Sequence, residues 1–355
     1  MNGLSPSEWT LPGRVVRRTQ RMTRKLRLRG SVRRVHGPDT FAGEGRPVAV
    51  CLIRNGAYHL DAFFAHHRAI GVERFVFIDN ASSDDTAARI MAEPGTAILH
   101  TNLRFKPFQN DLREMAARRY AAGGWCLFLD SDELFDFEGS ARIGIGGLAS
   151  HLDAQRCTGM AAQMLEMFPE GPLDAHAHLP YAQAIAAFDH YEIANARRMA
   201  YHDEAVSFSG LLETNVLTDD GVEILFGGVR GRVFSEECCL TKHPLVKVVG
   251  DVVPGRHPHC STHLRVAGIT GLIRHYKFAG DSFERDRATV AAGTHDHGED
   301  RLRLERRLAN PDLTLNGPDA RRYEGIGPLL ETGFLRSTPA YARWLEGEEA
   351  AAAAL

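Results

Sequence analysis

The sequence predicts an α/β fold in which a mixed, mainly parallel sheet is flanked by helices. The first observation behind this prediction is that short, apolar, β-branched runs alternate with segments of helical spacing between residues 47 and 130. This alternation is the pattern of a parallel sheet wound with helices. The second observation is composition. With 44% hydrophobic and 25% charged residues in 355, the chain is typical of globular proteins, which excludes a disordered, collagen-like or disulfide-rich miniprotein.

Each element of this region has its own signal. The run PVAVCLIRN is apolar on both faces and closes at Asn-Gly, which fits a buried parallel strand. The next segment spaces Leu60, Phe63 and Phe64 as one helix face and stops at a glycine. Ser and Asp caps open the helix after that. We expect strands at 47–55, 74–80, 96–102 and 125–130, and helices at 57–71, 81–93 and 109–124.

Beyond residue 140 the pattern stays rich in strands, and mixed or antiparallel pairing is expected there. The candidate strands are 160–168, 223–228, 229–234 and 269–278. After Ala279 the composition becomes charged and helical, with helices expected at 281–292 and 299–309. We therefore predict three regions: a basic arm and linker over 1–45, a catalytic domain over 46–280, and a C-terminal helical extension over 281–355.

The basic arm differs sharply in charge from the rest. From Arg14 to Arg34 the chain carries ten Arg or Lys and no acid, although the net charge is −3. Two interpretations stay open: a solvated tail, or a weakly amphipathic segment that contacts an anionic membrane or polymer. The chain has no apolar run long enough to cross a membrane and no signal-peptide core at its start. With six cysteines that lack framework spacing, this predicts a cytoplasmic protein with buried thiols, peripheral at the inner membrane surface if the arm binds lipid.

The strongest chemical signal follows the fourth strand, in Asp130-Ser131-Asp132-Glu133. Acids at the carboxyl end of a buried parallel strand project into the crevice where α/β sheets bind ligands. Asp130 and Asp132 are two residues apart, so in an extended segment they share a face and can address one divalent cation. Their hard oxygens suit Mg²⁺ or Mn²⁺, which keep open positions for phosphate oxygens. The alternative is that these acids only cap the next turn.

A second polar segment, Asp79-Asn80-Ala81-Ser82-Ser83-Asp84-Asp85-Thr86, ends the second strand. Neighbouring carboxyl ends of parallel strands meet, so this loop is expected beside Asn55 and near Asp130. It can form a pocket for a base and ribose, with Asp79 accepting a hydrogen bond. It can equally be no more than a helix cap.

Together, LIRN, VFIDNASSDDT, QNDLREMAARRY and WCLFLDSDELF resemble GT-A-fold glycosyltransferases of the family 2 superfamily, in a branch akin to family 92. The likeness covers residues 47–137, and GGVRGRVF, KHPLVK, GRHPH and IRHYKF follow in the same order. It implies a GT-A-type, Rossmann-like sheet and a metal-dependent enzyme that inverts the anomeric centre. The implied donor is a nucleotide-diphosphate sugar, foremost a UDP-sugar, and the implied acceptor is a hydroxyl of a glycan or glycolipid, with no nucleic-acid partner.

The resemblance also implies roles for particular residues. Asn55, Asp79, Asn80 and Asn110 match the nucleotide pocket, and Asp130 and Asp132 match the metal-binding acids, with His275 or His259 added to the metal or diphosphate. Arg54-Asn55-Gly56 replaces the usual Lys-Asn-Glu, and Asn80 stands where many relatives have a second Asp. The candidate cations for the leaving diphosphate are Arg230, Arg232 and Lys242.

A general base is required for inversion, and Glu213 and Glu166 are the preferred candidates among Glu166, Glu170, Asp189 and Glu213. A zinc site made of His257, His259, Cys260 and His263 is an alternative use of the histidines, although their crowding fits it poorly. Two other functions are weighed: a haloacid-dehalogenase-type phosphohydrolase, which would need Thr or Val where Leu134 stands, and a non-catalytic protein that binds polyanions or membranes through the arm.

Overall fold

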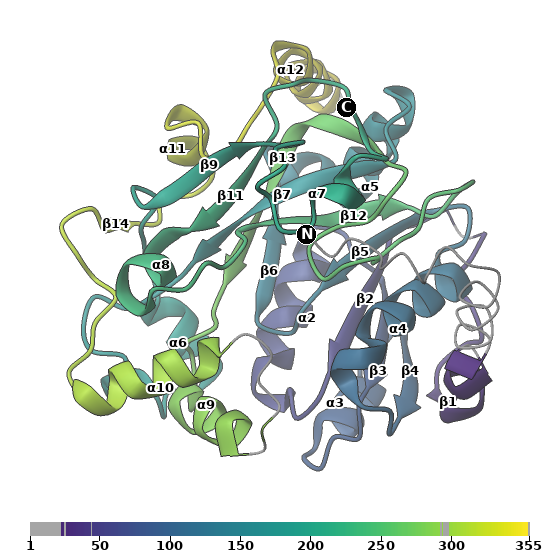
Figure 1. Ribbon diagram of the computed structural model, residues 1–355. Coiled ribbons are helices and arrows are strands. Elements are labelled where there is room, and N and C mark those ends of the chain that lie inside the picture. Colours follow the sequence, from purple (N-terminus) through teal and green to yellow (C-terminus); the bar gives the residue numbers. More distant parts are fainter. Residues whose placement is uncertain (1–22, 25, 44, 292, 294–297, 354–355) are drawn as a thin grey trace, which may run out of the picture.

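The computed structural model describes residues 23–24, 26–43, 45–291, 293 and 298–353, and it is an α/β structure with a large mixed sheet flanked by helices (Figure 1). The main sheet follows the strand order β1-β4-β3-β2-β5-β12-β7-β13-β10. Its first five strands in that order are β1 (Val32–His36), β4 (Thr96–Thr101), β3 (Arg74–Asp79), β2 (Val48–Ile53) and β5 (Trp125–Leu129). The predicted fold class, a mixed sheet covered by helices, is therefore confirmed.

The strand order reverses beside β2. The chain lays β3 and then β4 on one side of β2, all parallel, and then returns to place β5 on the other side. In open α/β sheets, the crevice outside the carboxyl ends of the strands at such a reversal is where ligands bind. The loops after β2 and β5, which begin near Arg54 and Asp130, both open at this point.

Both faces of these parallel strands are buried, which explains their unbroken apolar runs. Alternate residues such as Ala49 and Cys51 pack into a core that includes α2 (Leu60–Ala69) and α5 (Ser140–Ala154). The residues between them, such as Val48 and Val50, pack into a second core that includes α4 (Phe105–Tyr120). The predicted helix at 57–71 is a short 3₁₀ turn, η2 (Ala57–His59), that leads into α2, and the predicted capped helix is α3 (Thr86–Ala92).

The second half completes the sheet with mixed pairing, as predicted. The strands are β6 (Glu133–Asp136), β7 (Gly159–Glu166), β12 (Thr241–Lys247), β13 (Arg265–His275) and β10 (Val216–Leu217). Strand β12 runs antiparallel to both β5 and β7, whereas β13 runs parallel to β7 and antiparallel to β6. Small sheets pair β11 (Glu223–Gly227) with β9 (Ala196–Ala200) and β14 (Arg321–Arg322) with β8 (His190–Tyr191).

One predicted strand is wrong. Residues 229–234 belong to a helix, α8 (Gly228–Phe234), and not to a strand. Gly227 and Gly228 both have positive φ and turn the chain into it. Val229 and Val233 are four residues apart and both contact the core, so the run fits one helix face better than one strand face.

The boundary of the basic arm also needs correction. Val32–His36 were assigned to the arm, but they form β1, which pairs antiparallel with β4 at the edge of the main sheet. The linker after it packs as well, since Phe41 is buried and its ring lies 5.7 Å from that of Tyr120. Residues 14–22 and 25 of the predicted membrane-binding segment lie outside the described residues, and Arg27, Arg29 and Arg33 are exposed.

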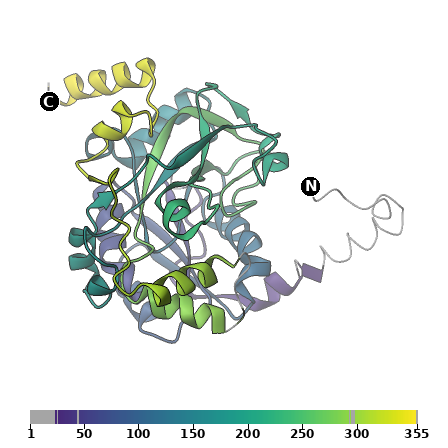
Figure 2. The ribbon, with the colours of Figure 1, turned by 60° about the vertical axis from the view of Figure 1, so that its left-hand side comes forward.

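The C-terminal extension is helical, as predicted. It contains α9 (Ser282–Ala291), α10 (Glu299–Ala309), α11 (Gly327–Glu331) and α12 (Pro339–Ala353). Figure 2 shows α9 and α10 together at one end of the molecule and α12 at the opposite end. Short helices between the strands of the second half are η3 (Asp174–His176), α6 (Tyr181–Ala187) and α7 (Ser209–Leu212).

Candidate functional site

The acidic motif forms a tight turn between β5 and β6, at the reversal of the strand order. The amide of Glu133 donates to the Asp130 carbonyl at 3.1 Å, and the Asp130 amide donates to the Glu133 carboxylate at 3.0 Å. The Glu133 side chain is only 1% exposed, whereas those of Asp130 and Asp132 are 37% and 24% exposed. The turn therefore points two carboxylates toward the crevice and keeps the third inside.

Asp130 is held by two cations from other elements. Arg113 of α4 donates to one carboxylate oxygen at 3.0 Å, and Lys242 of β12 donates to the other at 3.0 Å. Lys242 also pairs with Glu133. Desolvation raises the pKa of Asp130, but Lys242 and Arg113 outweigh it and leave this pKa below its usual value. Asp130 is thus ionised and anchored.

Asp132 faces a histidine that a second carboxylate orients. His275, at the end of β13, places Nε2 at 3.4 Å from Asp132 and Nδ1 at 3.0 Å from Glu166, the last residue of β7. Burial lowers the pKa of His275, but Glu166 and Asp132 together raise it to about 9. Burial raises the pKa of Asp132, and His275 brings it well below the usual value. A protonated His275 therefore bridges two carboxylates in this structure.

Asp132 and His275 could hold a divalent cation as its two protein ligands. Among the described residues, no group of three or more His, Cys, Asp or Glu side chains is arranged to hold a metal ion. Mg²⁺ and Mn²⁺ sites that also bind phosphate often use only one or two carboxylates, since waters and substrate oxygens complete the shell. The 3.4 Å between Asp132 and His275 brings a carboxylate oxygen and an imidazole nitrogen together at the crevice. Glu166 adds the carboxylate partner that metal-binding histidines generally have.

The predicted nucleotide loop lies beside Asn55, as expected. Asn55, at φ 51°, accepts a hydrogen bond from the Ser83 amide at 2.8 Å, and its own amide donates to the Ser82 hydroxyl at 2.9 Å. Asp79 accepts from the Ser82 amide at 3.0 Å and contacts His100 at 2.9 Å. Asp79 therefore stabilises the loop itself, whereas α3 begins at Thr86 after Asp85, whose side chain makes no capping hydrogen bond.

Asn80 and Asn110 differ in their surroundings. The side-chain amide of Asn80 donates to the carbonyls of Thr101 and Leu103 at 3.2 and 2.8 Å. This buried side chain therefore links the loop after β3 to the end of β4. Asn110, on α4, has a buried side-chain oxygen without a hydrogen-bond partner among the described residues, and Arg113 has a buried Nη1 in the same state. These two residues lie one helical turn apart, so α4 presents both an acceptor and a donor that are unsatisfied.

Arg230 and Arg232 form ion pairs with acids outside the acidic motif. Arg230 donates to Glu236 at 2.7 Å and lies 3.9 Å from Glu166, so it stands behind the His275 site. Arg232 donates to Glu192 at 2.8 Å. The structure brings only Lys242, of the three cations predicted for a diphosphate, into contact with the acidic motif.

The candidate bases are also placed differently from what the prediction needs. Glu166 is only 3% exposed, and its carboxylate accepts from His275 and from the Lys277 amide at 3.3 Å. It supports His275 and does not face an acceptor. Glu213 is exposed at the end of α7, and no side-chain contact joins it to the described part of the acidic site.

His259 lies near the ion pair of Asp130 and Lys242, and it is neutral. Burial, and next the charge of Lys242, lower the pKa of His259 to about 3, and its Nδ1 is 3.0 Å from the Thr241 carbonyl. His263 instead lies 3.2 Å from the Thr262 hydroxyl. These residues do not form a zinc site, since no three or more His, Cys, Asp or Glu side chains are arranged around a common point in the part of the chain that the structure describes. All six cysteines are buried and unpaired, as predicted.

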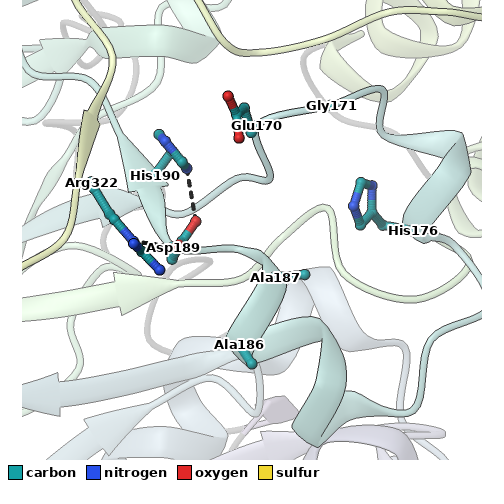
Figure 3. A pocket seen from close by; sticks show the side chains of 8 residues that line it. All are labelled: Glu170, Gly171, His176, Ala186, Ala187, Asp189, His190 and Arg322. Carbon is teal, nitrogen blue, oxygen red and sulfur yellow. Dashed lines mark hydrogen bonds and ion pairs between the residues drawn. The ribbon is translucent and has the colours of Figure 1, made fainter.

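A second hollow lies away from the acidic motif. A cavity of about 670 Å³ lies over η3, α6 and β8 and is lined by Glu170, Gly171, His176, Ala186, Ala187, Asp189, His190 and Arg322. The Asp189 carboxylate contacts His190 and Arg322, both at 2.7 Å. Figure 3 shows these three side chains together, away from His176. The lining of this cavity includes Glu170 and Asp189, two of the other candidates for the general base.

A smaller cavity, of about 60 Å³, does open onto the acidic motif. It is lined by Asp132, Lys277, Phe278, Ser282, Arg285, Asp286 and Arg303. The C-terminal helices α9 and α10 therefore contribute directly to the candidate site. The two cavities share no lining residue.

Sequence reasoning did not single out Arg113, Lys277 or His59. Arg113 is one turn from Asn110, a residue that the resemblance assigns to the nucleotide pocket, and Lys277 is two residues beyond His275. Both residues could therefore have been found in the sequence from their spacing to a residue that was already a candidate. His59 gave no signal beyond its place in a helix, yet it is buried beside Tyr181, and burial lowers its pKa to about 4, partly offset by Asp132.

No protein-family model and no curated protein sequence matches the chain. In the part of the chain that the structure describes, no helix combines the length and the apolar character needed to cross a membrane.

Proposed function

We propose that the chain is a metal-dependent glycosyltransferase of the GT-A type, which transfers a sugar with inversion from a nucleotide-diphosphate donor, foremost a UDP-sugar, to a hydroxyl of a glycan or glycolipid. One observation carries the proposal. Asp132 lies at the carboxyl end of β5, at the reversal of the strand order, and faces a histidine that Glu166 orients. This arrangement combines the ligand-binding crevice of an α/β sheet with donors for a divalent ion.

The residues of the chain would share the work as follows. Asp132 and His275 would hold the ion, and Glu166 would keep His275 in the orientation that presents Nε2. Asp130 would stay anchored by Arg113 and Lys242, and so fix the turn. When bound, Mn²⁺ or Mg²⁺ would stabilise the negative charge of the leaving diphosphate.

His275 also has a proton to release. In the structure its raised pKa keeps it protonated between two carboxylates. An imidazole nitrogen must be deprotonated to bind a metal, so ion binding at this site would release a proton. The general base for the acceptor hydroxyl remains a prediction. Glu213 stays the preferred candidate because it is exposed, whereas the carboxylate of Glu166 is buried and already bound to His275.

The rival phosphohydrolase is less well supported. Three parallel strands precede the acidic turn in the chain, and Leu134 occupies the position where that class needs Thr or Val. Both oxygens of Asp130 are bound by cations, which is unfavourable for a carboxylate that must attack phosphate. No described feature favours the purely non-catalytic alternative.

The test is a screen of nucleotide-sugar hydrolysis with Mn²⁺, run on the wild type, on Asp132→Asn and on Asp251→Asn, an exposed acid that serves as the control. We expect hydrolysis of at least one nucleotide sugar by the wild type and the control. EDTA and Asp132→Asn should each abolish it. Undiminished turnover in EDTA would contradict the metal-dependent mechanism.

A further inference from the structure

The small cavity beside Asp132 has an unusual charge balance. Five of its lining residues are ionisable: Asp132, Lys277, Arg285, Asp286 and Arg303. Asp132 is paired with His275 at 3.4 Å. The Arg303 guanidinium, 1% exposed, donates to both oxygens of Asp286 at 2.8 and 2.9 Å. The other two ionisable residues of the lining, Lys277 and Arg285, are cations outside these pairs.

Neither of these cations meets an acid among the described residues. Arg285 donates to the carbonyls of Lys277 and Ala279, at 2.8 and 3.0 Å. Lys277 is half-buried, and no ion pair joins it to a carboxylate in the described part of the chain. Lys277 and the exposed Arg285 can therefore both reach an anion that enters the cavity from solvent.

The position of the cavity limits what that anion is. Asp132 forms one wall, so the anion would lie beside the proposed metal ion. The N-terminal part of α9 contributes Ser282, Arg285 and Asp286, which places the positive end of a ten-residue helix at the cavity. At about 60 Å³, the space suits a small group such as a phosphate and is too small for a whole nucleotide.

We infer that Lys277 and Arg285 form the subsite for the terminal phosphate of the nucleoside diphosphate, the group that carries the negative charge when the sugar leaves. This inference rests on the proposed function and assigns the diphosphate to cations at the junction of β13 and α9, in place of Arg230 and Arg232. It also gives the C-terminal extension a part in donor binding.

The test compares two nucleotides that differ by that phosphate. Calorimetric titrations with UDP and with UMP, both with Mn²⁺, are made on the wild type, Lys277→Gln, Arg285→Gln and Arg287→Gln. Arg287 is the matched control, because it lies on the same helix and is exposed like Arg285, but it does not line the cavity and pairs with Glu284 at 3.4 Å. Melting temperatures confirm that each variant is folded.

We expect Lys277→Gln and Arg285→Gln to weaken UDP binding by roughly tenfold to a hundredfold, the loss of one charge-assisted hydrogen bond. UMP binding and the Arg287→Gln control should be unchanged. Equal weakening of UDP and UMP, or no weakening of either, would overturn the assignment.

Failure of the proposed function would look different. If the wild type binds neither nucleotide with Mn²⁺, the same variants are titrated with inorganic pyrophosphate alone. Binding that Lys277→Gln weakens would keep the anion subsite without the donor, whereas absence of binding would overturn the subsite as well.

Discussion

At the scale of single residues, the two aspartates of one motif have opposite surroundings. Asp130 has a fixed cation on each carboxylate oxygen, whereas Asp132 has a histidine and an open cavity. The motif alone predicted two equivalent metal ligands. The difference comes from Lys242 and Arg113, which lie far from the motif in the sequence and reach it through β12 and α4.

Lys242 is expected to be important for stability. In Lys242→Met, the buried Glu133 loses the ion pair that its burial requires. Removing one partner of a buried pair destabilises by roughly 3–5 kcal/mol. The free energy of unfolding from urea titration should fall accordingly. For Lys247→Met, whose pair with Asp153 is partly exposed, the loss should stay below about 1 kcal/mol. Equal losses in the two variants would show that the buried pair has no special role.

Glu166 is expected to act through His275. Glu166→Gln removes the carboxylate that orients the ring, and such changes typically cost 10–100-fold in metal affinity. Mn²⁺ affinity measured by electron paramagnetic resonance should fall by about that factor, with the protein still folded. The exposed Glu237→Gln serves as the control. Mn²⁺ affinity that is the same in all three proteins would separate Glu166 from the metal site.

At the scale of elements, the periodic segments could be predicted and the irregular ones could not. The strands at 48–53, 74–79, 96–101 and 125–129 follow from apolar runs with both faces buried. Helix α8 was missed because six residues of mixed apolar and basic character fit either period. Strand β1 was missed because Arg33 and Arg34 resemble the arm, although charged side chains suit a sheet edge.

The edge strand gives a prediction about truncation. Removing residues 1–31 leaves β1 in place, whereas removing residues 1–37 exposes the edge of β4 that β1 covers. We expect the longer truncation to melt several degrees lower than the shorter one and to form more aggregate in size-exclusion chromatography. Identical melting of the two proteins would mean that β1 adds nothing to the sheet.

At the scale of the whole molecule, the site depends on contacts between distant segments. A chain of side chains runs from Asp132 through His275, Glu166 and Arg230 to Glu236, and Glu236 contacts Arg303 of α10 at 2.8 Å. The sequence showed the acidic motif and the late histidine, but this series of pairs needs tertiary structure. The C-terminal helices were predicted as an extension, and the structure packs two of them, α9 and α10, against the site.

Buried histidines predict a loss of stability in acid. Burial lowers the pKa of His243 to about 4, so between pH 6.5 and 4 the unfolded chain takes up a proton that the folded one does not. His243 alone thus accounts for up to roughly 3 kcal/mol of lost stability. The melting temperature should fall less between pH 7 and pH 5 in His243→Asn than in the wild type. An equal fall would contradict this, and the exposed His178→Gln should match the wild type.

The most direct test of the central claim is a titration of the intact protein with UDP in Mn²⁺ and again in EDTA, for the wild type and for His275→Ala. The claim is that Asp132 and His275 hold a divalent ion through which a nucleoside diphosphate binds. It predicts binding by the wild type in Mn²⁺, loss of that binding in EDTA, and strong weakening in His275→Ala even with Mn²⁺. UDP affinity that is the same with and without the ion would contradict it.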